Sequence, residues 1–492
     1  MTINNLSDEV LLNIFRYCLD ASPRCWPRLV RLCRKWRCLI FASQRALHLR
    51  LFCIHGTPVL KCLHFWPALP IVVEYGGFPT LDPPSSEDED NVLAALKRSD
   101  RVTSIHLTLT KSLLANLSSI EEPFSNLEDL VLLNQDSTEL TLPSTFRWGP
   151  RLRTLRLTGI NYPAPLQRLS SSADIVDIQL HNIAGAACLS PDALAITLSG
   201  MTQLQSLSLH LRPSTSHPEH IDILPSSAGG RRVTFPALTR LAFGGTSGFL
   251  DRFVAGINSP RLDNIEIMFN QPTFFVSKLS DFIGRIEMHK SHRRADILFS
   301  DRSVSISLTQ STPTCLRLQV FCESLSLQLY SMAQICSRFS AFLLGVEHLR
   351  ISGMRPSSGR DDSDRDGWLK LMHPFRGTKW VHVAGDHSTN IVLALRHSEM
   401  RRKTVLPALH KLCIREPKPS CTTLQEAVVS FMHSRRHSGH IIGVEYERSW
   451  INGLRGTGIK LVYCQLSSAL IWSVQVLFLS KSHLKCSLKM SF

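Results

Sequence analysis

Hydrophobic and polar residues alternate along this chain in a pattern that returns at regular intervals. An aliphatic residue is followed by two more, three and five positions later, and this motif begins at Val102, Leu127, Leu152 and Ile175. Successive starts are roughly 23 to 25 residues apart. Such alternation is typical of a strand with one covered face. Its regular return predicts an array in which each unit covers the apolar face of its neighbour.

The motif continues toward the C-terminus, where it begins at Leu204, Leu238, Leu262, Val346, Leu409 and Ile441. Residues 304–308 and 325–329 alternate in a similar way and are predicted to be strands with less regular flanks. Helices are predicted after Ser190, over residues 279–286, and after the capping pair Thr423 and Glu426.

Intervals of this length are those of leucine-rich repeats. We therefore expect an α/β protein in which residues 92–450 form an irregular leucine-rich-repeat solenoid with a parallel sheet. A generic α/β domain with parallel strands is the alternative.

Residues 1–50 have a different, helical period. Ser7 can cap a first helix whose apolar positions share one face, and Pro27 suits the first turn of a second helix. A second apolar stripe runs from Leu29 to Ile40. Two short helices cannot bury both stripes between themselves, so we expect either a cap on the following array or a module that binds a partner.

Residues 6–40 resemble an F-box. Residues 6–17 contain the pair Ile14-Phe15, and residues 30–40 contain Cys33-Arg34-Lys35-Trp36-Arg37, at the separation that the family shows. Ser7 stands where the family usually has proline. Together with the repeats, the chain is similar to a large group of fungal F-box proteins with leucine-rich repeats.

The resemblance implies that this module docks a Skp-type adaptor, which links it to a cullin and a ubiquitin-conjugating enzyme. The residues that it implies for the adaptor contact, or for the small core beneath it, are Leu6, Val10, Leu11, Ile14, Phe15, Leu29, Val30 and Trp36. Residues 51–91 are expected to be a connector with an acidic linker that ends in Glu87-Asp88-Glu89-Asp90.

The strand alternation also predicts a binding surface. If the leucines of each motif point inward, the residues between them lie on the open, concave face of the sheet. These target-binding candidates are His106, Asp129, Arg156, Gln179, Arg240, Glu266, Arg350 and His382. Their mixed charge suits a protein partner, whose identity the sequence does not reveal.

The composition of the chain limits the partners and the kinds of site that we expect. The 492 residues include 55 Lys and Arg against 40 Asp and Glu, giving a net charge of +15, which is compatible with acidic partners. The basic residues are scattered, so nucleic acid is not an expected partner. The 14 cysteines contain no Cys-x-x-Cys pair, which disfavours a zinc module or a disulfide framework and favours the cytoplasm or nucleus. Hydrolase, P-loop and zinc-protease motifs are absent, so we expect no catalytic residue, metal or cofactor.

Residues 451–492 lack the repeat motif and form a basic and apolar tail. From residue 461 to 480 no charged residue occurs, which is long enough for a membrane-spanning helix, although Gln465 and Gln475 lower its hydrophobicity. The combined features predict a non-catalytic substrate-recognition subunit of a Skp-cullin-F-box ubiquitin ligase. The alternative is a leucine-rich-repeat interaction scaffold without ligase function. In one form of this alternative, the tail tethers the scaffold to a membrane.

Overall fold

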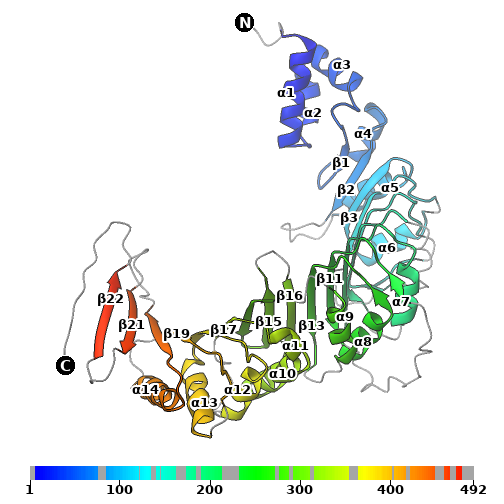
Figure 1. Ribbon diagram of the computed structural model, residues 1–492. Coiled ribbons are helices and arrows are strands. Elements are labelled where there is room, and N and C mark those ends of the chain that lie inside the picture. The colour runs from blue at the N-terminus through cyan, green and yellow to red at the C-terminus, as the bar shows by residue number, and fades with distance from the viewer. Residues whose placement is uncertain are drawn as a thin grey trace. The chain divides into compact units, whose positions relative to one another are not determined.

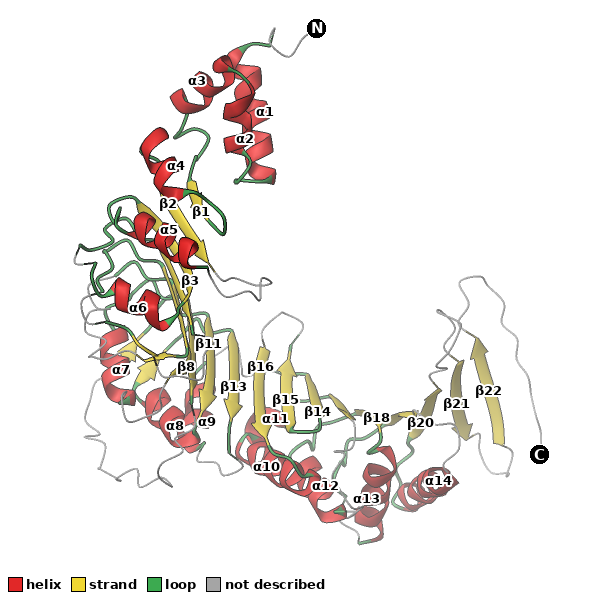
Figure 2. Cartoon of the chain, turned by 180° about the vertical axis from the view of Figure 1, so that it is seen from behind, coloured by secondary structure: helices red, strands yellow, loops and turns green. Residues whose placement is uncertain are grey.

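The computed structural model divides the chain into two compact units, residues 1–217 and 218–492. The residues that it describes are 6–75, 85–120, 122–134, 140–143, 146–161, 173–183, 190–212, 232–271, 276–286, 292–310, 315–353, 364–401, 404–416, 422–448, 459–465 and 472–478. In each unit, parallel strands form a sheet and the helices that follow them lie on one side of it (Figures 1 and 2).

The first unit begins with three helices and continues as a series of strands with helical or irregular returns. Its helices are α1 (Asp8–Ala21), α2 (Trp26–Leu32), α3 (Arg34–Ala42), α4 (Val59–Phe65), α5 (Ser86–Leu96), α6 (Lys111–Leu117) and α7 (Pro191–Leu198). Its strands are β1 (Leu51–Cys53), β2 (Ile71–Tyr75), β3 (Val102–Thr108), β4 (Asp129–Leu133), β5 (Leu140–Thr141), β6 (Thr154–Thr158), β7 (Ile160–Asn161), β8 (Asp177–Ile183) and β9 (Ser206–Leu211).

The sheet of the first unit is parallel throughout, in the order β1, β2, β3, β4, β6, β8, β9. Asp129 pairs with Thr154, and Thr154 pairs with Asp177, so the intervals read from the sequence are the register of the sheet. Leu130, Leu132, Leu155 and Leu157 are each at most 2% exposed. Each such leucine contributes about 1.5 to 3 kcal/mol by burial, which holds the stack together.

The sheet begins earlier than the sequence predicts. Residues 51–91 are expected to be a connector, but β1 and β2 within them already pair with each other, and β2 pairs with β3. The acidic residues expected in the linker form the first turn of α5, where carboxylates are favoured by the helix dipole. The part of the expected linker from 76 to 84 lies outside the described residues.

The second unit repeats this arrangement with longer helices. Its helices are α8 (Ser247–Ala255), α9 (Ser277–Gly284), α10 (Leu325–Arg338), α11 (Ser340–Leu343), α12 (Arg365–Met372), α13 (Ser388–Met400) and α14 (Thr422–His437). Its strands are β10 (Val233–Thr234), β11 (Arg240–Gly245), β12 (Ile257–Asn258), β13 (Asn264–Phe269), β14 (Arg294–Phe299), β15 (Ser303–Thr309), β16 (Cys315–Phe321), β17 (His348–Gly353), β18 (Trp380–Gly385), β19 (Lys411–Glu416), β20 (Gly443–Arg448), β21 (Ile459–Gln465) and β22 (Trp472–Phe478).

Apart from β21 and β22, which pair antiparallel at the C-terminal edge, one part of this sheet departs from the parallel order that the sequence predicts. The order is β11, β13, β16, β15, β14, β17, β18, β19, β20, β21, β22, in which β15 runs antiparallel to both its neighbours. Only residues 300–302 connect β14 to β15, which is too short for a parallel crossover and therefore makes a hairpin. The solenoid is a predominantly parallel sheet with this meander inserted.

Two further predictions are corrected. Residues 325–329 are not a strand but the start of α10, because the Ser324 side chain caps the helix by accepting from the Leu327 amide. The uncharged stretch 461–480 is not one helix: its described residues lie in β21 and β22, which pair antiparallel. Among the helices in the described residues, none combines the length and the hydropathy needed to cross a membrane.

Candidate partner-binding surfaces

The N-terminal helices form a small module with its own core. Ser7 caps α1 by accepting a hydrogen bond from the Val10 amide, as predicted. The rings of Phe15 and Trp36 pack edge to face with centroids 4.8 Å apart, and Phe15 is fully buried. This contact between α1 and α3 fixes the two helices against each other.

The second predicted helix is in fact two helices that meet at Cys33. This residue is extended, and its sulfur accepts from the Trp36 amide to begin α3. The break frees carbonyl groups at the end of α2, and the Arg37 side chain donates to one of them, that of Val30, at 3.0 Å. Because Cys33 leaves the helix with a φ of −156°, the turn needs no glycine.

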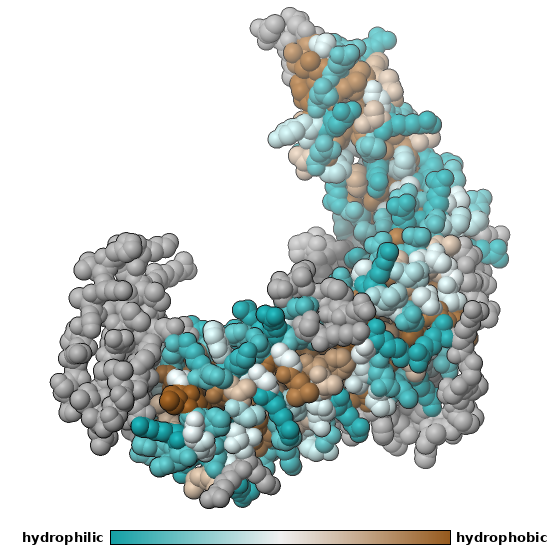
Figure 3. Space-filling model, viewed as in Figure 1, coloured by the Kyte–Doolittle hydropathy of each residue, from teal (hydrophilic) through white to brown (hydrophobic). Residues whose placement is uncertain are grey.

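The eight predicted adaptor residues divide between the core of this module and its surface. Leu11, Phe15, Val30 and Trp36 are buried, Leu6, Ile14 and Leu29 are half-buried, and Val10 is 44% exposed. Sequence reasoning missed Tyr17 and Leu32, which are 79% and 65% exposed. Val10, Ile14 and Tyr17 are spaced by four and three residues and therefore form one apolar stripe on α1. In Figure 3, hydrophobic residues gather over this module near the N-terminus.

The module is attached to the first strands of the sheet. Trp26 is 1% exposed, and its indole N–H donates to the Arg50 carbonyl at 2.8 Å. The ring packs edge to face on Trp66 with centroids 4.6 Å apart. Arg24 forms an ion pair with Glu74 in β2. The module therefore covers part of the β1 end of the sheet as well as presenting its own surface.

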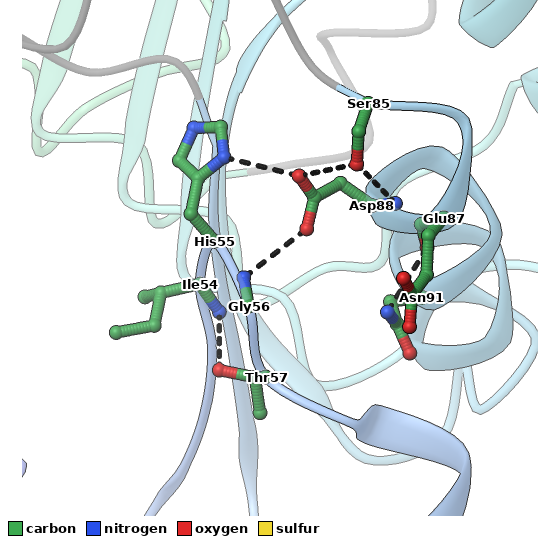
Figure 4. A network of polar contacts seen from close by, with 8 residues as sticks. All are labelled: Ile54, His55, Gly56, Thr57, Ser85, Glu87, Asp88 and Asn91. Atoms are coloured by element: carbon green, nitrogen blue, oxygen red, sulfur yellow. Dashed lines mark hydrogen bonds and ion pairs between the residues drawn. The ribbon is translucent and has the colours of Figure 1, made fainter.

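A polar network ties α5 to the turn after β1 (Figure 4). One Asp88 carboxylate oxygen accepts from the Gly56 amide at 3.1 Å, and the other contacts both the Ser85 hydroxyl at 2.8 Å and His55 Nδ1 at 3.4 Å. The Ser85 hydroxyl in turn accepts from the Asp88 amide at 3.2 Å, so the serine and the aspartate make the hydrogen bonds of a helix cap. The network is a helix cap joined to a turn.

The open face of the sheet in the first unit carries the predicted polar row. His106 and Arg156 lie on either side of Val131 in the register, and Gln179 follows Arg156. Asp177, one pleat away, accepts from Arg156 at 3.1 Å and from Gln179 at 2.9 Å. Asp129 is in register with Thr154 in the same row as Asp177. The four candidates from this unit therefore share one surface.

Two histidines on this face have lowered pKa values. Burial lowers the pKa of His106, and Arg156 lowers it further against the opposing effect of Asp129. Burial also lowers the pKa of His181, with His210 and Arg156 adding to the effect. The His181 imidazole lies 2.9 Å from the Ser208 hydroxyl. His181 and His210 were missed as members of the face, although the same alternation places them there.

The second unit continues the pattern on its own sheet. Glu266 lies between two arginines on neighbouring strands, 4.0 Å from Arg240 and 3.8 Å from Arg317. Arg350 and His382 are directly paired in the register of β17 and β18. The alternation thus places all four predicted residues of this unit on the face away from the helices.

Among the described residues, Trp380 is the most exposed of the large apolar side chains that the sequence reasoning missed on this face; Leu298 and Phe321 are 47% and 42% exposed. Trp380 begins β18 two positions before His382, so it points to the same side, and it is 51% exposed. The prediction considered only polar side chains at such positions, whereas an exposed tryptophan in the same alternation is the stronger indication of a contact surface.

Comparisons with known proteins assign this chain to no family. A scan against protein-family models found no match, and a search of curated proteins found none. One solved structure, the leucine-rich-repeat-containing protein LegL7 from Legionella pneumophila, is 12% identical, covers 78% of this chain and 97% of its own, and has a TM-score of 0.26. A similarity at this score supports no argument, so the repeat architecture rests on the register of the strands.

The described residues also bear on metal chemistry. Among them, no group of three or more His, Cys, Asp or Glu side chains is placed to hold a metal ion. What the described residues offer instead is an apolar stripe on α1 and two polar sheet faces, one in each unit. These are surfaces suited to contacts with other macromolecules.

Proposed function

We propose that this protein is a non-catalytic substrate receptor of a Skp-cullin-F-box ubiquitin ligase. In this proposal the N-terminal module docks a Skp-type adaptor and, through it, a cullin, while the sheet faces hold a target protein. Ubiquitin transfer then follows from proximity, because the receptor holds the target beside the recruited conjugating enzyme.

The observation that carries the proposal is that some apolar side chains of α1 are buried in the core of the module while others stay exposed. Phe15 and Leu11 complete the core of the module, yet Val10 and Tyr17 remain 44% and 79% exposed beside it. An apolar stripe left outside an already formed core costs solubility unless a partner covers it. The F-box resemblance of the same residues supports an adaptor helix as that partner.

Co-purification of the full-length protein with a Skp-type adaptor tests this role. Val10→Glu and Tyr17→Glu place a charge on the stripe without entering the core, so each should abolish retention of the adaptor while leaving the helical circular dichroism unchanged. Arg16→Glu is the matched control, because Arg16 is exposed on α1 away from the stripe. Variants of Phe15 or Trp36 are unsuitable, since losing either ring would unfold the module itself.

A second function is favoured by the contact between Trp26 and the Arg50 carbonyl. In it, the chain is an interaction scaffold whose helical module only caps the sheet. This scaffold would retain no adaptor, and Val10→Glu would behave like the wild type in every binding assay. Deleting residues 1–45 would lower the melting temperature of the first unit for either function, because Trp66 would lose the ring that packs on it, so adaptor retention is the measurement that separates the two.

A further inference from the structure

The sheet face of the second unit contains an aromatic and basic cluster between β14 and β19. Arg294, His348 and Trp380 are neighbours in one row of the register, and Arg350 lies one pleat along β17. The Trp380 ring meets His348 edge to face at 4.6 Å, and Lys411 Nζ lies 5.5 Å from its centroid. Half of the tryptophan surface nevertheless remains exposed.

Most carboxylates of this face already have cationic partners. Glu266 is shared by Arg240 and Arg317, and Glu445 lies 2.7 Å from Lys411. One register row contains Trp380 and the next contains His382. Together these two rows hold five basic side chains and three carboxylates. The basic residues are Arg240, Arg294, Arg317, Arg350 and Lys411, and the acidic residues are Glu266, Asp296 and Glu445. The face therefore has a surplus of positive charge.

The surplus is concentrated on β14 and β17. Arg294 and Arg350 are both exposed, and within the described part of the chain their guanidinium groups have no hydrogen bond or ion pair. Asp296 is opposite Arg350 in the register, so one carboxylate stands near two free guanidinium groups. A planar guanidinium of this kind binds a carboxylate through two parallel hydrogen bonds.

We infer that this cluster binds an extended acidic segment of a partner protein, with carboxylates on Arg294 and Arg350 and an apolar side chain against Trp380. Neighbouring strands are about 4.8 Å apart, so Arg294 and Trp380 are separated by roughly 10 Å, which is about three residues of extended chain. Because alternate side chains of an extended chain share a face, the segment should carry its acidic residues two or four positions from the apolar one. Tryptophan and arginine are the residue types that most often dominate the energy of such contacts.

The pattern of charge favours a peptide over a nucleic acid. Asp296 and Glu445 interrupt the basic positions, and a polyphosphate strand with a charge at each nucleotide would meet these carboxylates wherever it crossed them. A segment with a few carboxylates can place each one on an arginine and avoid the acidic positions.

Fluorescence anisotropy with the full-length protein tests the inference. The probe is a labelled peptide in which glutamates stand two and four residues before a leucine, so that all three side chains share a face, and the comparison peptide has lysines in place of the glutamates. Arg350→Glu and Trp380→Ala should each weaken binding of the acidic peptide by about tenfold or more. The matched controls are Arg365→Glu, at the start of α12, and Tyr330→Ala, which is 57% exposed on α10; both lie on the helical side and should bind as the wild type does.

Three results would overturn the inference: no saturable binding of the acidic peptide, equal binding of its lysine counterpart, or equal losses in the control variants. Binding of a single-stranded RNA that is lost in Arg350→Glu would assign the face to nucleic acid instead. Although the inference rests on the proposed receptor role, the assay contains no adaptor. Peptide binding without adaptor retention would refute only the ligase function, and adaptor retention without peptide binding would refute only this inference.

Discussion

A buried ion pair joins α13 to α14. Removing one of its two charged side chains should lower the free energy of unfolding more than replacing both with apolar side chains. Arg435 Nε lies 2.7 Å from Glu399 Oε1, and the two side chains are 0% and 1% exposed. Burial lowers the pKa of Arg435, and the neighbouring Glu399 opposes this effect. The guanidinium also donates to the Leu406 carbonyl at 2.9 Å, so it satisfies a backbone group that no water reaches.

Removing one partner leaves the other as an isolated buried charge. Arg435→Met and Glu399→Leu should each lower the free energy of unfolding of the second unit by about 3 to 5 kcal/mol. The double variant Arg435→Met with Glu399→Leu removes both charges, so its remaining cost is the unpaired Leu406 carbonyl, about 1 to 3 kcal/mol. The double variant is therefore expected to be more stable than either single variant.

Urea denaturation of all three variants gives the free energies, and hydrogen exchange over residues 388–400 and 422–437 locates the change. The control is Glu347→Gln, which breaks the exposed 2.9 Å pair with Lys379 and should leave the midpoint unchanged because exposed pairs contribute little. If the double variant loses as much as the sum of the single variants, the two charges do not compensate each other and the reasoning is refuted.

Two other predictions concern the first unit. The pKa of His181 is lowered in the folded protein, so the unfolded chain binds more protons on acidification; the resulting stability is complete above about pH 6.5 and is lost as the pH falls below it. His181→Gln should flatten the dependence of the melting temperature on pH between about 7 and 5, and an unchanged slope would contradict this. The Asn91 side chain accepts from the buried Val59 amide at 3.0 Å and donates to the Glu87 carbonyl at 2.9 Å, so Asn91→Ala should cost about 1 to 3 kcal/mol in chemical denaturation; an unchanged denaturation midpoint would show that these hydrogen bonds do not stabilise the unit.

The local sequence pattern was sufficient to predict a strand or a helix start where a few neighbouring residues decide the backbone conformation. The alternation at Leu130, Leu155 and Ile178 predicted strands that pair in the expected register. Ser7 and Pro27 located two helix starts, because a cap or a proline acts on the backbone within a few residues. The same reasoning failed at residues 325–329, where alternating leucines fit a strand but the Ser324 cap begins a helix.

The sequence predicted which side of the sheet the candidate surface residues occupy, whereas their binding roles stay predictions. Alternation correctly placed Arg156 and Arg350 on the open face, since the side of a strand follows from its position alone. It did not separate Val10, which is exposed, from Leu11, which is buried. Both are apolar and adjacent, and their difference depends on where α3 packs.

The sequence by itself determined the strands that carry the repeat motif, the spacing of those repeats and which of their residues share a face, because these follow from periods of a few residues along the chain. Only the tertiary structure decided that β14 to β16 form a meander, that Arg435 and Glu399 meet in the interior, and that Trp380 stays half exposed beside free arginines. Those outcomes depend on pairings between residues far apart in sequence, and the free energy of such a pairing is set by which partner surfaces meet and how much water they exclude.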